Sequence, residues 1–285
     1  MAAMLGWRNR PVLPKQSGPP TASYLLMLAL LASCPCSPTA AGGLRKPGVD
    51  LELVLAVDVS SSMTRAEQQV QRDGYVSAFR HPDLARAIGS GARGAIAVSY
   101  LEWAGPGYQR VIMPWTIVGG ADDAKRFADA LSTKPIVAEA GTSISGGLLA
   151  AAGLLAHSQA AGERRVVDIS GDGPNNVGLP LEPIRDMLTS SGITINGLPL
   201  SLAHSGSNGF QSFGRQYLSL YYEHCVIGGP DAFVIGIDDL AMFEVAIRRK
   251  LLLEIAGRPS RPSLASYTIP GSPAFDCSMP GAVQR

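Results

Sequence analysis

The sequence has 285 residues, of which 46% are hydrophobic and 16% charged, and it contains 32 Gly and 21 Pro. Basic and acidic side chains nearly balance, at 24 against 23, which leaves no basic excess to neutralise a nucleic-acid backbone. The low charge and the many glycines and prolines favour a buried sheet joined by tight turns over a coiled coil or a disordered chain. We therefore expect one globular domain with short extensions and no nucleic-acid partner.

Residues 1–41 have the composition of an export signal. Basic but no acidic side chains precede the apolar run 24–32, which small residues and prolines follow. This run of about nine residues is far shorter than the ~20 residues that span a bilayer as a helix. Cleavage after residue 41 would release a soluble protein, whereas the segment LASC at 31–34 resembles a lipobox whose Cys34 would be lipidated. We expect an exported chain, periplasmic or secreted, that touches a membrane only through such a lipid anchor.

The remaining chain divides into a domain at 42–256 and a tail rich in Pro and Ser at 257–285. Two cysteines, Cys225 and Cys277, remain once the signal is removed. In an oxidising compartment they would form a disulfide that ties the end of the domain to the tail, although two free buried thiols also fit the sequence. Neither cysteine belongs to a CxxC or HxxxH pair, so the pattern does not favour a zinc site.

Strands and helices are expected to alternate along the domain. A capping box from Thr64 to Glu67 marks the start of the first helix, and the turn Gly105-Pro106-Gly107 makes the second and third strands an antiparallel hairpin. The repeated strand-then-helix order predicts an α/β fold, a three-layer, doubly wound, Rossmann-like domain with a mostly parallel sheet and one antiparallel edge strand. The expected strands are 49–58, 95–103, 109–116, 165–170, 193–198 and 232–237, and the expected helices are 64–79, 122–131, 143–156, 181–190, 211–222 and 240–255.

Hydroxyl and carboxylate side chains stand near the carboxyl ends of these strands. The segment DVSSS after the first strand places Asp58, Ser60 and Ser62 at alternate positions, which an extended turn directs to one spot. Thr142 precedes a helix and Asp172 ends a later strand, so both should lie at the same edge of the sheet as Asp58. Hard oxygen ligands of this kind suit Mg²⁺, Mn²⁺ or Ca²⁺. Taken alone, the DxSxS pattern is also typical of ordinary turns and helix caps.

Three segments together carry a family resemblance. DVSSSM after the first strand, GTSIS before a helix and SGDG at the end of a later strand resemble the metal-ion-dependent adhesion site of the von Willebrand factor type A domain. The resemblance covers residues 49–256. Within that superfamily, the stretches YLEWAGPG, FRHP and SGDGPNN look most like an uncharacterised group of exported bacterial proteins, a domain of unknown function. No established activity comes with that group.

The resemblance implies a role for each residue of the three segments. Ser60 and Ser62 would bind the metal through their hydroxyls, and Thr142 would bind it directly or through water. Asp58 and Asp172 would hold the metal mainly through water. A partner protein would supply an Asp or Glu carboxylate to the open coordination position, so that the metal serves as the adhesive. The resemblance thus implies a protein-binding module and not an enzyme.

Four further residues are candidates for the rim that meets the partner. Glu102 and Trp103 lie at the tip of the hairpin, where an exposed Trp103 would anchor a partner, although it fits equally well packed beneath the Gly-Pro-Gly turn. Asn175 and Asn176 follow Asp172 and would act either as outer ligands of the metal or, more simply, as side chains that close a turn.

One acidic residue departs from the pattern of the family. Asp168 falls inside a strand that should be buried, where an apolar residue is usual. A buried carboxylate needs a partner, and Arg164, Arg165 or a backbone donor would serve.

Two other functions remain open. GDGPNN also resembles the GDGxND motif of haloacid dehalogenase-type phosphatases, in which Asp58 would be the nucleophile and Asp172 a Mg²⁺ ligand. Against this, Ser60 stands where that family has a second acid, and Asn176 replaces the last Asp of its motif. The other alternative is a structural domain that keeps the motif residues, holds no metal and uses another face for assembly.

Overall fold

The computed structural model describes residues 46–201, 215–257 and 275–278. All of them belong to the second of the two compact units into which the chain divides, residues 44–285. The predicted export signal, the lipidation of Cys34 and most of the tail lie outside the described residues, as does the start of the helix expected at 211–222.

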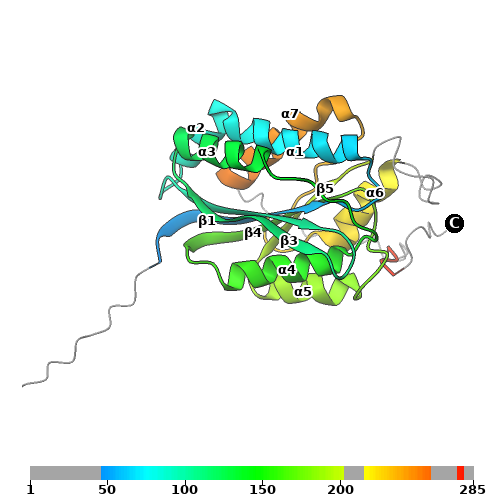
Figure 1. Ribbon diagram of the computed structural model, residues 1–285. Coiled ribbons are helices and arrows are strands. Elements are labelled where there is room, and N and C mark those ends of the chain that lie inside the picture. Colours follow the sequence, from blue (N-terminus) through cyan, green and yellow to red (C-terminus); the bar gives the residue numbers. More distant parts are fainter. Residues whose placement is uncertain (1–45, 202–214, 258–274, 279–285) are drawn as a thin grey trace, which may run out of the picture. The chain divides into compact units, whose positions relative to one another are not determined.

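A five-stranded sheet forms the middle layer of the domain (Figure 1). Its strand order is β3-β2-β1-β4-β5, which places β1 at the centre. β1 pairs in parallel with β2 and β4, β4 pairs in parallel with β5, and β3 is an antiparallel edge strand against β2. The fold class expected from the sequence is therefore confirmed. The strands are β1 (Gly48–Asp58), β2 (Ile96–Trp103), β3 (Gln109–Val118), β4 (Ala161–Gly171) and β5 (Thr194–Pro199).

The central strand is apolar on both faces because helices cover both sides of the sheet. Leu53 and Leu55 of β1 pack into one hydrophobic cluster, while Val54 and Ala56 pack into another on the opposite face. This alternation follows from the two-residue period of a strand, and a nearly continuous apolar run is typical of a parallel strand buried on both faces. The same period determines that the side chain of Asp58, the last residue of β1, lies on the face of Val54 and Ala56.

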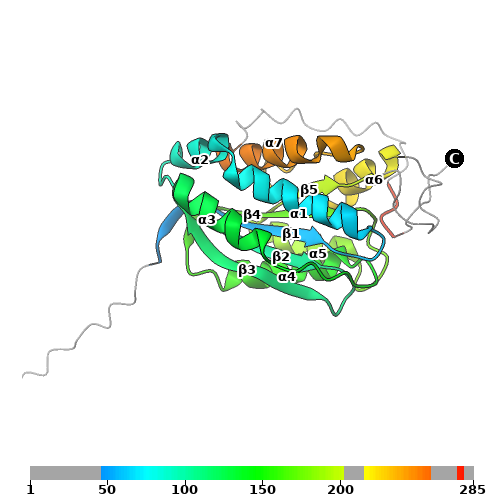
Figure 2. The ribbon, with the colours of Figure 1, turned by 45° about the horizontal axis from the view of Figure 1, so that its top comes forward.

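Two helical layers sandwich the sheet, and α1 lies between α3 and α7 in the first of them (Figure 2). That layer consists of α1 (Arg65–Arg80), α2 (Pro82–Gly89), α3 (Ala121–Ser132) and α7 (Phe243–Ala256), whose apolar residues join the cluster of Leu53. The opposite layer contains α4 (Ile144–Ala156), α5 (Leu181–Ser190) and α6 (Arg215–Tyr221), and α6 continues as a π-helix at Tyr222–Val226.

Local signals explain where several elements begin. The capping box before α1 is confirmed, since Thr64 and Glu67 each accept a hydrogen bond from the other's backbone amide. The prediction of a strand at 232–237 is wrong, because this segment forms only isolated bridges, from Val234 to Gly197 of β5 and from Ile237 to Leu200 just after β5. The sequence analysis missed α2, although His81 caps it and Pro82 occupies its first turn. No helix within the described ranges is long and apolar enough to cross a membrane.

The disulfide between Cys225 and Cys277 is present, as the sequence led us to expect for an oxidising compartment. The partner of Asp168 is neither of the two arginines we considered. Its carboxylate lies 2.6 Å from the ammonium of Lys250, a residue of α7 in the helix layer that covers this face of the sheet. Arg164 instead donates hydrogen bonds to backbone carbonyls at the end of α7, among them that of Glu254.

Candidate metal site

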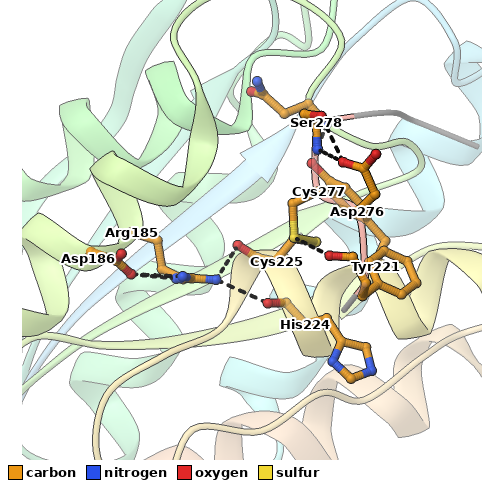
Figure 3. The surroundings of a disulfide bond; sticks show 10 residues. Arg185, Asp186, Tyr221, His224, Cys225, Asp276, Cys277 and Ser278 are labelled. Carbon is orange, nitrogen blue, oxygen red and sulfur yellow. Dashed lines mark hydrogen bonds and ion pairs between the residues drawn. A yellow bond between two sulfur atoms is a disulfide. The ribbon is translucent and has the colours of Figure 1, made fainter. Parts of the chain in front are cut away.

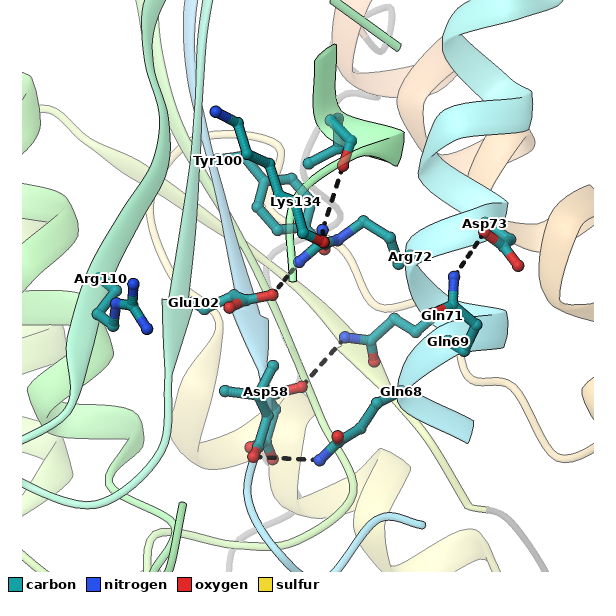
Figure 4. Close-up of polar contacts among 12 residues, drawn as sticks. Asp58, Gln68, Gln69, Gln71, Arg72, Asp73, Tyr100, Glu102, Arg110 and Lys134 are labelled. Atoms are coloured by element: carbon teal, nitrogen blue, oxygen red, sulfur yellow. Dashed lines mark hydrogen bonds and ion pairs between the residues drawn. The ribbon is translucent and has the colours of Figure 1, made fainter. Parts of the chain in front are cut away.

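The loop after β1 is held in a fixed shape by its own side chains and by α1. The backbone amide of Ser60 donates to Asp58 Oδ1 at 2.7 Å, and the hydroxyls of Ser60 and Ser62 lie 2.8 Å apart. Gln68 of α1 donates to the carbonyl of Ser60. Gln71 of the same helix donates to the carbonyl of Asp58 (Figure 4). These bonds satisfy the buried backbone of the loop, so the carboxylate and both hydroxyls are left to face one another.

Asp172 enters the same spot from the neighbouring strand. β1 and β4 run in parallel with Val57 beside Ser170, so their carboxyl ends lie next to each other. The hydroxyl of Ser62 donates to Asp172 Oδ1 at 2.6 Å across this junction. The two segments are far apart in the sequence, and the topology of the sheet alone brings them together.

Thr142 reaches the site on the loop before α4. This loop runs beside the one after β1, because Ser60 and Glu139 form a backbone bridge. The position of Thr142 is also fixed by Asn176, whose side-chain oxygen accepts a hydrogen bond from the Thr142 backbone amide at 3.0 Å. The Thr142 hydroxyl lies 4.0 Å from the point where a Cβ on Gly173 would stand, next to Asp172. The structure thus brings together all five residues predicted for the metal, which we call the strand-end cluster: Asp58, Ser60, Ser62, Thr142 and Asp172.

The electrostatics of the strand-end cluster call for a positive charge. Asp58 Oδ2 and Asp172 Oδ2 are buried and have no hydrogen-bond partner within the described ranges. No ion pair in the described part of the chain involves either carboxylate, although Glu67 adds a third acid nearby. Burial raises the pKa of Asp172 to about 6, and burial together with the charge of Asp172 raises the pKa of Asp58 well above its usual range. Two buried carboxylates without a cation are costly, and a divalent cation would compensate both.

The donor set is of the kind that hard cations prefer. It consists of three hydroxyls and two carboxylates, without nitrogen or sulfur. No group of three or more His, Cys, Asp and Glu side chains that could hold a metal occurs among the described residues. Any cation here would therefore depend on the Ser and Thr hydroxyls as much as on the two aspartates, and the residues present fit Mg²⁺, Mn²⁺ or Ca²⁺.

The prediction that Glu102 and Trp103 form an exposed rim is wrong. β2 lies between two other strands, and both side chains are buried, at 1% and 0% exposure. Glu102 forms an ion pair with Arg72 of α1, as Figure 4 shows. The Trp103 indole packs under α4, where a Cβ on Gly147 would come within 2.9 Å of it. Trp103 is therefore packed, as the alternative expectation stated. It packs beneath α4, however, and not beneath the Gly-Pro-Gly turn.

Asn175 and Asn176 act through the backbone of the neighbouring loop. Asn175 Oδ1 accepts from the amide of Ser145 at 3.0 Å, and its Nδ2 donates to the carbonyl of Leu179. Asn176 makes a reciprocal pair with Thr142, since its own amide donates to the Thr142 carbonyl at 2.9 Å. Both asparagines therefore fasten the Thr142 loop to the Asp172 turn.

Sequence reasoning missed the supports of the strand-end cluster. Gln68 and Gln71 stand three residues apart on α1, which places them on one face of the helix, and their polar side chains on a buried face are a usable signal. Tyr222 is also buried against the cluster, but it comes from a helix more than a hundred residues away from Asp58. No local pattern marks such a residue.

Comparison with known proteins agrees with this architecture. Residues 48–259 match the model of the family described as "Protein of unknown function (DUF1194)". No curated protein sequence matches the chain.

Several solved structures share the fold at low sequence identity. Proximal thread matrix protein 1 from the mussel byssus is 13% identical with a TM-score of 0.51, and the alignment covers 73% of this chain and 48% of that protein. The pilus adhesin SpaC from Lactobacillus rhamnosus GG is 16% identical with a TM-score of 0.51, over 73% of this chain and 30% of the adhesin. A von Willebrand factor type A protein from Catenulispora acidiphila is 14% identical with a TM-score of 0.48, over 73% and 43% of the two chains. This chain spans less than half of each.

Proposed function

The chain belongs to the DUF1194 family of proteins of unknown function, and from its three-layer α/β fold we propose that it is an exported module of the von Willebrand factor type A kind that binds a partner protein through a divalent cation. The observation that carries the proposal is the pair of buried, unpartnered carboxylate oxygens of Asp58 and Asp172 beside three hydroxyls. In this proposal Ser60, Ser62 and Thr142 bind the cation and the two aspartates neutralise it. The bound cation would supply an electrophilic centre that attracts a carboxylate from the partner.

The proposed partner presents an Asp or Glu side chain. The cluster itself consists of oxygen atoms and carries acidic groups, so an acidic partner would be repelled without the cation and attracted with it. The mussel protein and the pilus adhesin share the fold, and the second is named as an adhesin, which is consistent with a role in binding proteins. Export is supported by the disulfide, because such bonds persist in oxidising compartments.

Mn²⁺ titration of the full chain tests the metal site directly. At about a hundred times its dissociation constant, Mn²⁺ should stabilise the folded state by ~2.7 kcal/mol, which for a domain of this size raises Tm by roughly 5–10 °C. Ser62→Ala should lose this increase, whereas the matched control Ser61→Ala, an exposed hydroxyl in the same loop, should keep it. No increase in the wild-type chain would overturn the proposal and favour the metal-free structural alternative.

A second step tests the partner chemistry. A peptide with a single Glu should bind the Mn²⁺-loaded chain and be released by EDTA, and the same peptide with Gln should not bind. Turnover of p-nitrophenyl phosphate with Mg²⁺ that disappears in Asp58→Asn would instead favour the phosphatase. That phosphatase chemistry would also need a suitably placed lysine, and Lys125, a candidate in the middle of the chain, is ion-paired with Asp129 on α3.

A further inference from the structure

The side chain of Tyr222 lies on one face of the sheet and extends across two strands toward the strand-end cluster. Tyr222 is the first residue of the π-helix that follows α6, and its side chain is fully buried. Its ring lies over Gly197 of β5, where a Cβ would come within 2.7 Å of Tyr222 Cδ1. Its hydroxyl lies over Gly171 of β4, 2.8 Å from the Cβ position there. Because both of these residues are glycines, no side chain blocks the ring, which can therefore lie flat on the two strands and extend toward β1.

The hydroxyl of Tyr222 ends beside Asp58. Asp58 Oδ2 lies 2.9 Å from the same Cβ position on Gly171. Within the described ranges neither the hydroxyl nor this carboxylate oxygen has a hydrogen-bond partner. A carboxylate oxygen accepts and a phenolic hydroxyl donates, so the two buried atoms are complementary. Leaving both unpaired would cost more than pairing them.

The preceding tyrosine contacts Asn175, one of the residues that support the cluster. The hydroxyl of Tyr221, the last residue of α6, accepts from the backbone amide of Asn175 at 3.2 Å. Asn175 in turn holds the loop before α4 through the amide of Ser145. The junction between α6 and the π-helix therefore supports the cluster at two points, and π-helical turns occur frequently at functional sites.

Residues 275–278, which we call the C-terminal clip, hold this junction from outside. Cys277 is bonded to Cys225 within the π-helix (Figure 3). Phe275 stacks on Tyr217 of α6 and on His224, with ring centroids 5.6 and 5.1 Å apart. The clip thus fastens both the helix that precedes Tyr222 and the turn that follows it.

We propose that Tyr222 is a positioning residue of the metal site, whose hydroxyl turns to donate to Asp58 Oδ2 when the cation is bound and fixes that carboxylate toward it, and that the C-terminal clip keeps Tyr222 in place. This inference rests on the proposed function, because it concerns the same cation. Groups that orient a metal's ligands commonly contribute 10–100-fold to metal affinity.

The test compares Tyr222→Phe with Tyr75→Phe in the full chain. Tyr75 is a matched control, since its side chain is equally buried and belongs to α1 on the other face of the sheet. The dissociation constant of Mn²⁺ is measured from the EPR signal of free Mn²⁺, and urea unfolding without metal is measured alongside. Tyr222→Phe should bind Mn²⁺ about 10-fold or more weakly, and the zero-field splitting of the bound ion should change. Tyr75→Phe should change neither the dissociation constant of Mn²⁺ nor the zero-field splitting of the bound ion.

The outcomes separate this inference from the proposed function. If the wild-type chain binds no Mn²⁺, both proposals fail. If it binds Mn²⁺ and Tyr222→Phe binds with the same affinity and spectrum, only the role of Tyr222 is overturned. The double variant Cys225→Ser/Cys277→Ser keeps every residue of the cluster and should also weaken Mn²⁺ binding, and an unchanged affinity in it would overturn the role of the clip.

Discussion

Lys250 is a buried cation that serves two buried acids. Its ammonium lies 2.6 Å from Asp168 and is also ion-paired with Glu254, one turn later on α7. All three side chains are essentially inaccessible to solvent. Asn196 of β5 donates to the same Glu254 oxygen and links the group to the sheet. The group thus joins α7 to two strands by charge as well as by apolar packing.

Removal of the charge on Lys250 should strongly destabilise the fold. Above pH 7, where Glu254 is ionised, Lys250→Met leaves two carboxylates buried without a counter-ion, and breaking a buried ion pair in this way costs about 3–5 kcal/mol. Urea unfolding of the variant should show this loss in the free energy of unfolding. Arg249→Met is the matched control, because Arg249 is the adjacent basic residue on α7 and is exposed. A loss below about 1 kcal/mol would show that the acids are protonated or hydrated in the folded state.

At the scale of elements, the C-terminal clip adds a covalent bond to a domain that has its own core. The hydrophobic cluster of Leu53 contains none of the residues 275–278. The cluster of Val54 on the opposite face is contacted by Phe275 and Cys277, which are partly buried at its margin. The disulfide closes a loop of 52 residues, for which the chain-entropy relation gives a stabilisation of up to ~4 kcal/mol.

Cys225→Ser/Cys277→Ser should therefore fold but be less stable. We expect cooperative urea unfolding with a free energy lower by about 2–4 kcal/mol, and far-UV circular dichroism like that of the wild-type chain. The control is the wild-type chain with and without a reducing agent, which should reproduce the same loss. If the double variant does not unfold cooperatively, the domain depends on the clip to fold, contrary to this expectation.

Elements with a local signal were predictable, and elements without one were not. The capping box at Thr64 fixed the start of α1, and the apolar run to Asp58 identified β1. The segment 232–237 has a strand-like composition, but it forms only isolated bridges near β5. A strand also needs a continuous backbone ladder with a neighbour, and the local sequence does not encode that pairing. Glu102 was expected at the rim because it lies at the tip of the hairpin, yet the ion pair with Arg72, thirty residues earlier, allows it to be buried.

At the scale of the molecule, the strand order explains why the candidate site could be predicted. β1 is central, so the carboxyl ends of β2 and β4 lie on either side of Asp58. Asp172, which follows β4, therefore comes close to Asp58, whereas Thr142 arrives on the loop before α4, which bridges to the loop after β1 through Ser60 and Glu139. The partners of Asp168 and of Tyr222 come from distant helices, and their contacts depend on how the layers pack and not on a motif.

The stability of the whole domain should fall as the pH rises from about 4.5 to 7. Burial, with the charge of Asp168 as a second cause, raises the pKa of Glu254 to about 7. In this window the folded protein keeps a proton that the unfolded chain has lost, so unfolding releases a proton and becomes easier at higher pH. The loss attributable to Glu254 is on the order of 2 kcal/mol.

Urea unfolding at several pH values measures this dependence. Glu254→Gln should reduce the slope between pH 4.5 and 7, whereas Glu244→Gln, an exposed acid on the same helix, should leave it unchanged. The slope should not vanish, because burial also raises the pKa of Asp168, Asp58 and Asp172. An equal slope in the wild type and in Glu254→Gln would show that Glu254 is ionised in the folded protein throughout this range.

The location of Cys277 beyond α7 also determines the order of events during synthesis. A nascent chain that extends to the end of α7 already contains all five strands and the whole strand-end cluster, but not the second cysteine of the disulfide. The sheet and its two helix layers are thus available to assemble first, while Cys225 is still a thiol. The bond between Cys225 and Cys277 can form only after all of these elements have been synthesised.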